Sequence, residues 1–190
     1  FMGVKKGSHD DLNKEVNKYL IKGGIVTEAI KANATNALRK YFVDKGFYDV
    51  EVTASEEPDS SRINSVRLIF DIDRNPKVKI SEITFSGVKN VKEGKLRNLM
   101  KETRRKKRLL ASSKLIKAKF EEDKKKIIEH YNKIGFRDAL VKGDSIWRGD
   151  DGGLRVHLNI FEGNRYFFRN ITWKGNSIYD TKLLSGILGI

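Results

Sequence analysis

The chain has 190 residues, of which 38% are hydrophobic and 34% charged, and its net charge is +14. Such a composition is typical of globular domains, and no apolar run approaches the roughly 18 to 20 residues that a membrane-spanning helix needs. Cysteine is absent, which excludes disulfides and thiolate metal sites, and the three histidines lie far apart in the sequence.

The apolar spacing in the first part of the chain predicts one long helix and two strands. The helix is expected over residues 27–45 and is followed by Gly46, a residue type that tolerates the left-handed conformation after a helix. Strands are expected over 50–54 and 66–72, with a loop through Pro58 between them.

The middle of the chain is predicted to open with a strand and to continue with two helices. Apolar and polar residues alternate over 78–85, and Gly87 closes this strand. A short helix is expected over 90–102. A longer one is expected over 114–134, where apolar residues fall on roughly one face and acids gather early, as the helix dipole favours. Gly135 is placed to end it.

A β-hairpin is predicted after the second helix. Its arms cover residues 139–146 and 154–160, and the glycine-rich segment 148–153 forms the turn. Beyond the hairpin, the sequence predicts a strand over 166–173 and a helix that begins near Tyr179. The core of the middle region is expected to contain these apolar residues: Ile80, Ile83, Phe85, Leu99, Phe120, Ile127, Tyr131, Val156, Leu158 and Ile160.

The sequence repeats itself with a period near 88 residues. Segment 77–87 returns as 165–175, with a basic residue, an apolar run, Ile-Thr-aromatic and a closing glycine in each copy. Segment 41–49 returns as 130–138. Two echoes at nearly one period predict tandem modules. The predicted divisions are a module over residues 1–77 that lacks its first strand, a complete module over 78–164, and the start of a third over 165–190.

The predicted middle module has an edge strand in the first arm of its hairpin. A three-stranded sheet covered on one face by two helices leaves two edges. An edge presents unpaired backbone N–H and C=O groups, so another chain can add a strand there. The residues expected to bind a partner in this way are Leu140, Val141, Lys142, Gly143, Asp144, Ser145 and Ile146.

The order of these elements resembles that of POTRA (polypeptide-transport-associated) domains. The shared signatures are Ile83-Thr84-Phe85-Ser86-Gly87, Ile171-Thr172-Trp173-Lys174-Gly175-Asn176, and the helix exits Lys45-Gly46-Phe47 and Ile134-Gly135-Phe136. Segments 37–47 and 169–176 most resemble the BamA-like outer-membrane protein assembly factors in their Bacteroidetes-like form. The resemblance covers nearly the whole chain.

The resemblance implies an α+β fold of tandem modules, each β-α-α-β-β with a three-stranded mixed sheet covered by two helices. It also implies a position at the periplasmic face of the outer membrane, ahead of a membrane β-barrel. There the modules would receive unfolded outer-membrane proteins and dock accessory lipoproteins. The family carries no catalytic residue and no cofactor. The matching glycines are expected to be structural turns: Gly46, Gly87, Gly135 and Gly175.

The basic segment 101–126 supports a different function. It contains a run of five cations within the linker 103–113, namely Arg104, Arg105, Lys106, Lys107 and Arg108. Such a run could bind the phosphates of anionic lipid head groups or of nucleic acid, or it could be a solvated loop. The run lacks the interleaved aromatic residues that stack on bases, which makes nucleic acid the less favoured partner.

Two further alternatives concern the class of protein. The same domains also occur in transporters of the two-partner secretion type, and the number of modules in the full-length chain would separate that reading from an assembly factor. An enzyme is not expected, because the sequence shows neither a nucleophile with a base nor a phosphate-binding glycine loop. No metal site or cofactor is predicted.

Overall fold

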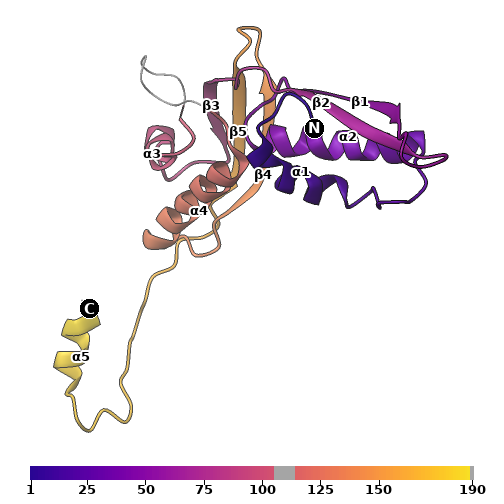
Figure 1. The fold of residues 1–190 in the computed structure, drawn as a ribbon. Helices are drawn as coiled ribbons and strands as arrows, with labels where there is room; N and C mark the ends of the chain where they lie inside the picture. The colour runs from indigo at the N-terminus through magenta and orange to yellow at the C-terminus, as the bar shows by residue number, and fades with distance from the viewer. Residues whose placement is uncertain (105–113, 189–190) are drawn as a thin grey trace.

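The computed structural model describes residues 1–104 and 114–188, and Figure 1 shows two α+β modules side by side, with a C-terminal segment leading away from the second. We call residues 1–77 the first module, 78–164 the second module and 165–188 the C-terminal segment. The elements are η1 (Lys6–Ser8), α1 (His9–Val16), α2 (Glu28–Asp44), β1 (Glu51–Pro58), β2 (Val66–Asp73), β3 (Ile80–Ser86), α3 (Glu93–Leu99), α4 (Lys117–Lys133), β4 (Leu140–Arg148), β5 (Leu154–Phe161) and α5 (Thr181–Leu188).

The second module has the predicted order β-α-α-β-β. Its sheet has the strand order β3-β5-β4, in which β3 runs parallel and β4 antiparallel to β5. Side chains from β3, α3, α4 and β5 build one hydrophobic core beneath the sheet, because each element buries a single apolar face. Every residue predicted for this core is buried except Leu99, which is partly buried and packs at its margin.

The first module packs two helices against an antiparallel pair of strands. Leu12 and Val16 of α1 join α2, β1 and β2 in a second, separate core. The sequence analysis did not predict α1, an eight-residue helix with only these two buried side chains. Pro58 is the last residue of β1 and not part of a loop. A proline without an N–H is tolerated at the end of an edge strand.

Among the described residues of the first module, the strands are β1 and β2, and an isolated bridge at Met2 precedes them. Met2 forms a parallel bridge with Asp71 of β2, and its amide donates to the carbonyl of Phe70 at 2.8 Å. Gly3 follows with φ +72°, as Gly87 follows β3 with φ +76°. A Cβ at either glycine would lie within about 2 Å of a carbonyl oxygen of the neighbouring strand, at 2.1 Å and 1.9 Å respectively. Met2 and Gly3 therefore lie beside β2 as Ser86 and Gly87 lie beside β5.

The predicted strand over residues 166–173 is not formed in this structure. A strand needs a neighbouring strand for its backbone groups, and no described strand pairs with this segment, although the amide of Tyr166 donates to the carbonyl of Gly135. Phe167 and Phe168 are exposed. Gly175 lies further along, in the left-handed conformation of a turn. The predicted helix near Tyr179 is present as α5.

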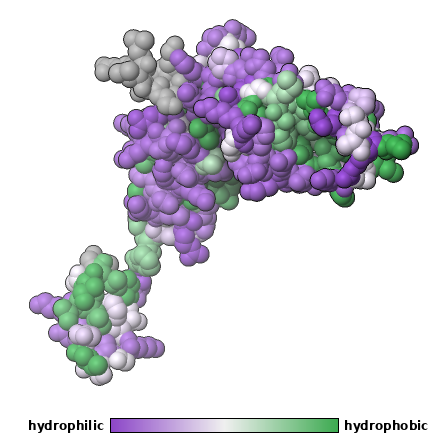
Figure 2. Space-filling model, in the orientation of Figure 1, coloured by the Kyte–Doolittle hydropathy of each residue, from purple (hydrophilic) through white to green (hydrophobic). Residues whose placement is uncertain are grey.

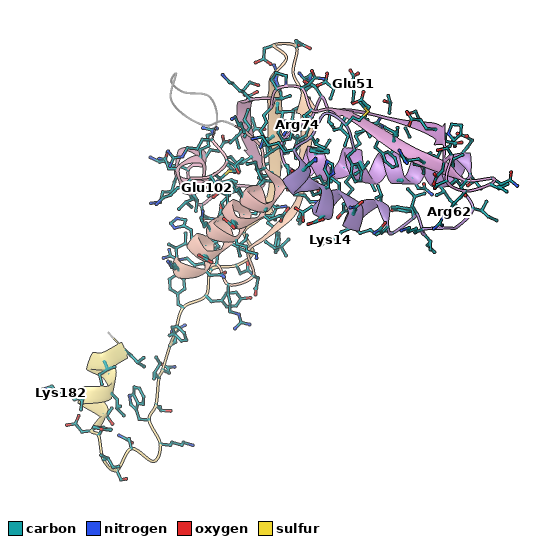
Figure 3. The ribbon with its side chains drawn as sticks, viewed as in Figure 1. Lys14, Glu51, Arg62, Arg74, Glu102 and Lys182 are labelled. Carbon is teal, nitrogen blue, oxygen red and sulfur yellow. The ribbon has the colours of Figure 1, made fainter. Side chains whose placement is uncertain are left out.

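The surface is largely hydrophilic on the face seen in Figure 2, with apolar residues gathered over part of the first module and over α5. Charged side chains extend from both modules in Figure 3, and Lys182 of α5 lies far from Arg62 at the β1–β2 hairpin. Among residues 1–104 and 114–188, no helix is long and apolar enough to cross a membrane.

The two modules meet where α2 ends. Tyr48 packs against the core of the second module, and burial raises the pKa of its hydroxyl to about 12. Arg148, at the end of β4, forms an ion pair with Asp49. The ammonium of Lys117, at the start of α4, lies 3.5 Å from a carboxylate oxygen of Asp44. These contacts join the end of the second module's hairpin and the start of α4 to the first module.

The helix exits at Gly46 and Gly135 are equivalent positions in the two modules. Both have the left-handed backbone that the sequence predicts, with φ of +91° and +95°. A Cβ at Gly46 would lie 2.7 Å from the carbonyl oxygen of Leu115, and one at Gly135 would lie 2.9 Å from that of Tyr166. The absence of a side chain at Gly46 allows the second module to approach closely. The absence of one at Gly135 does the same for the C-terminal segment.

Candidate functional site

The candidate site is the free edge of β4, where all seven residues predicted to bind a partner lie. In the sheet order β3-β5-β4, this strand is hydrogen-bonded to β5 alone. Nearly the whole of β4 is exposed to solvent, including Trp147, whose residue exposure is 43%. Within the described residues, the strand therefore has one side free for an added strand.

A β-bulge divides the edge of β4. The pairing register shifts between Val141, which faces Ile160, and Gly143, which faces Asn159. Lys142 is the extra residue, and its ammonium lies 4.9 Å from the centre of the Phe161 ring. A bulge twists the edge of a sheet, and the charge of Lys142 lies on this edge. Both features limit pairing between copies of the chain.

The opposite edge of the sheet, β3, is covered by side chain and backbone. Arg97 of α3 donates a hydrogen bond from Nε to the carbonyl oxygen of Ile83, at 3.0 Å. Lys79, just before β3, forms an antiparallel bridge with Lys114. Both edge strands of a sheet present backbone groups that lack a partner strand. Because Arg97 and Lys114 cover part of the edge at β3, β4 is the more accessible edge.

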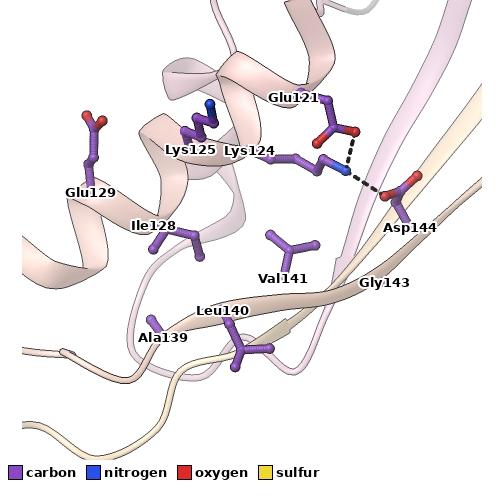
Figure 4. A pocket seen from close by; sticks show the side chains of 10 residues that line it. All are labelled: Glu121, Lys124, Lys125, Ile128, Glu129, Ala139, Leu140, Val141, Gly143 and Asp144. Atoms are coloured by element: carbon purple, nitrogen blue, oxygen red, sulfur yellow. Dashed lines mark hydrogen bonds and ion pairs between the residues drawn. The ribbon is translucent and has the colours of Figure 1, made fainter. Parts of the chain in front are cut away.

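An open groove of about 460 Å³ runs between α4 and β4. In Figure 4, Val141 points from the strand toward Ile128 of the helix, while Leu140 points away from it. Ala139 lies beside Leu140 at the apolar end of the groove. The full lining is Glu121, Lys124, Lys125, Ile128 and Glu129 from the helix, Ala139 just before the strand, and Leu140, Val141, Gly143 and Asp144 from the strand.

Lys124 closes the other end of this groove. Its ammonium lies 2.7 Å from a carboxylate oxygen of Glu121 and 2.8 Å from one of Asp144, so it joins the helix to the edge strand (Figure 4). We call Glu121, Lys124 and Asp144 the Lys124 clasp. The lysine side chain is only 15% exposed. Burial alone would lower the pKa of Lys124, but the hydrogen bonds to Asp144 and Glu121 outweigh it and raise the pKa.

The predicted basic run falls mostly outside the described residues. Arg104 is described and exposed, whereas Arg105, Lys106, Lys107 and Arg108 lie in the segment 105–113, outside the described residues. The chain enters this segment from a fixed point, because the amides of Glu102 and Thr103 donate to the buried carboxylate of Asp123, at 3.0 Å and 2.6 Å.

The sequence analysis missed Arg97 and Lys124 as part of the candidate site. Each is one basic residue among many on its helix. Its role depends on which strand it reaches, and nothing in its local pattern distinguishes it. Over residues 1–104 and 114–188, no group of three or more histidine, aspartate or glutamate side chains could hold a metal ion.

The family model of POTRA, described as "Surface antigen variable number repeat", matches residues 1–75 and 78–163. A provisionally named outer membrane protein assembly factor of Treponema pallidum (strain Nichols) is 24% identical over 175 residues. That match covers 89% of this chain, and the chain spans about a fifth (20%) of the relative's length.

Solved structures with a similar fold were also found. The N-terminal domain of Omp85 from Thermosynechococcus elongatus is 19% identical with a TM-score of 0.47, over 85% of this chain and 59% of that one. POTRA domains 3–5 of BamA from Haemophilus influenzae are 13% identical with a TM-score of 0.44, over 97% and 71%.

Proposed function

The chain belongs to the POTRA family, and we propose that it acts as a periplasmic scaffold of an outer-membrane β-barrel assembly machine, where it receives unfolded outer-membrane proteins by strand addition. The observation that carries this proposal is the free edge of β4 beside the apolar groove. The name of the Treponema pallidum relative, an outer membrane protein assembly factor, agrees with it.

Strand addition suits such a client because it uses backbone groups that every sequence has. An outer-membrane strand alternates apolar and polar residues, so one set of its side chains would face the same way along β4. Those side chains would enter the groove and contact Val141 and Ile128, while the other set would face solvent. A binding site of this kind accepts many clients and requires no catalytic group.

The proposal also includes docking of accessory lipoproteins, for which exposed aromatic residues on a rigid strand are suitable anchors. Trp147 lies on β4 close to Arg148 and its ion pair with the first module. Tryptophan and arginine are enriched among residues that dominate binding energy at protein interfaces. A folded partner on this end of β4 would leave the groove beside Val141 open to a client.

The test uses the 190-residue chain and an alternating Thr–Val octapeptide as the probe for an unfolded strand. Amide chemical shifts of β4 are followed by NMR during titration, and affinities are compared for Val141→Pro and Val141→Thr. Proline removes a backbone donor and is expected to weaken binding about tenfold or more if that donor points outward. Threonine keeps the donor and the branched shape, so it should bind like the wild type.

The salt dependence of the same titration separates this function from an anionic-surface binder. Backbone pairing should change little with salt, whereas binding of phosphates by the basic segment 101–126 would weaken steeply as salt rises. Unchanged amide shifts in β4 at saturating peptide would overturn the proposal. Tight, salt-sensitive binding to vesicles of anionic lipid in that case would favour the alternative.

A further inference from the structure

The first module contains a second clasp built like the Lys124 clasp. Lys31 of α2 forms ion pairs with Glu28, three residues earlier on the helix, and at 2.6 Å with Glu56 of the edge strand β1. Its side chain is 17% exposed, and the hydrogen bonds to Glu28 and Glu56 raise its pKa. A partly buried lysine therefore joins the second helix to the edge strand in both modules.

The two clasps stand at different distances from their helix exits. Lys124 lies 11 residues before Gly135, whereas Lys31 lies 15 residues before Gly46. The difference of four residues is about one helical turn, or about 6 Å.

The strands show the same offset. Asp144 pairs with Leu158, three residues before the end of β5, and Glu56 pairs with Leu68, five residues before the end of β2. Two strand residues span about 6.6 Å, the repeat between side chains on one face. The clasp of the second module therefore lies closer to the helix exit than that of the first module. The difference is one turn along the helix and two residues along the strand.

We propose that the Lys124 clasp sets the register of a strand added to β4. The side chains of the added strand that face α4 would fill the groove as far as Asp144 and no further. This inference rests on the proposed function. The apolar groove extends from Ala139 to the clasp, where the lysine side chain fills the space between helix and strand. A bulky apolar side chain level with Asp144 would have to displace a partly buried ammonium and leave two carboxylates without it.

The fixed position of Lys124 makes it a firm stop. Its ammonium is held by Glu121 and Asp144 and lies 4.9 Å from the centre of the Phe120 ring. The preferred occupant is thus an extended segment with an apolar side chain level with Val141 and a small or polar one level with Asp144. The Lys31 clasp would place the equivalent stop one side chain further along β1.

The experiment measures register directly. An alternating Thr–Val octapeptide carries a nitroxide at its N-terminus and is added to the 190-residue chain. Because this peptide looks the same in every register that differs by two residues, only the protein can select one. Broadening of the β4 amide signals is expected at one set of positions in the wild type. In Lys124→Met, the broadened signals should lie two residues closer to Ile146, or at both the wild-type and the shifted positions.

Affinity gives a second readout. Extending the peptide by one Thr–Val pair should change the affinity of the wild type little. In Lys124→Met the extension should raise it about tenfold, the gain from burying one more valine side chain. Lys133→Met is the matched control, because it removes the same charge from an exposed residue at the end of α4 that does not line the groove.

Lys124→Arg keeps a cation between Glu121 and Asp144 and should restore the wild-type pattern. Asp144→Asn serves as a second way to loosen the clasp should Lys124→Met fail to fold. The β4 amide signals could shift on peptide addition yet broaden in the same pattern in the wild type, Lys124→Met and Asp144→Asn. That result would overturn this inference and leave the proposed function standing. Absence of any shift in wild-type β4 would overturn the proposed function itself.

Discussion

The hydroxyl of Tyr131 donates a 2.9 Å hydrogen bond to the carboxylate of Glu162, and both residues are buried at the base of the second module. The same carboxylate accepts hydrogen bonds from the backbone amides of Lys89 and Asn90 and from the Asn90 side chain. One acid therefore ties α4 to the residues after β3 and to the end of β5.

Glu162 should make the second module sensitive to acid. Burial opposes ionisation, but the hydrogen bonds from Asn90, Lys89 and Tyr131 outweigh it and lower the pKa of Glu162 below the ordinary 4.5. The stabilisation is present above pH 4.5 and is lost as pH falls through the lowered value. At pH 7, Glu162→Gln should cost about 1–3 kcal/mol.

Urea unfolding at pH 7 and below pH 4 measures this effect. The difference in unfolding free energy between the wild type and Glu162→Gln should shrink on acidification. A difference that stays constant over this range would show that the charge of Glu162 contributes nothing to stability.

Asp123 is a buried acid whose loss should loosen the connection between α3 and α4. Its side chain is 0% exposed, it accepts the amides of Glu102 and Thr103, and it pairs with Lys126 at 2.9 Å. Asp123→Ala leaves two amides unsatisfied and should destabilise the second module by about 2–4 kcal/mol. Glu122→Ala, on the same helix, should change stability by less than about 0.5 kcal/mol. Equal losses for the two variants would contradict this.

The sequence predicts the elements of the second module well because each buries one apolar face with a clear period. Ile127 and Tyr131 recur at helical spacing and are both buried, and β4 is an edge strand as its place in the hairpin suggests. The bridge from Met2 to β2 was not predicted, although a signal for it exists. Phe1-Met2-Gly3-Val4-Lys5 echoes Phe85-Ser86-Gly87-Val88-Lys89 at a spacing of 84, outside the main period.

Contacts that decide which edge is open could not be predicted from the sequence. The bond from Arg97 to the Ile83 carbonyl and the reach of Lys124 to Asp144 depend on how closely a helix approaches a strand. That distance follows from packing of the whole core and not from the residues beside each cation. In a segment rich in lysine and arginine, no local pattern separates these two from the solvated ones.

Arg97→Ala should open the β3 edge and promote self-association. Removing the guanidinium leaves the carbonyl of Ile83 without its 3.0 Å donor, so a second molecule can supply one by strand pairing. Sedimentation velocity should show a concentration-dependent dimer that the wild type lacks. Lys95→Ala, on the same short helix, should stay like the wild type. Monomeric Arg97→Ala at all concentrations would indicate that β3 is protected by other means.

Gly135→Ala should destabilise the second module and detach the C-terminal segment. The glycine has φ +95°, and an added Cβ would lie 2.9 Å from the carbonyl oxygen of Tyr166. The amide of Tyr166 donates to the carbonyl of Gly135 at 2.8 Å, so the two backbones cannot separate without losing this bond. The left-handed backbone alone costs about 1 kcal/mol for alanine. Hydrogen exchange at Tyr166 should accelerate, and the melting temperature should fall by several degrees.

The contrasting variant is Gly94→Ala in α3, where an added Cβ meets no atom within 4 Å. Alanine favours helix over glycine, so this change should stabilise the same module slightly, by about 0.5–1 kcal/mol. Opposite signs for the two substitutions would show that the close approach and backbone conformation at Gly135, and not the loss of a glycine as such, determine the effect. A negative φ at Gly135 in a crystal structure, or equal melting temperatures for Gly135→Ala and the wild type, would refute it.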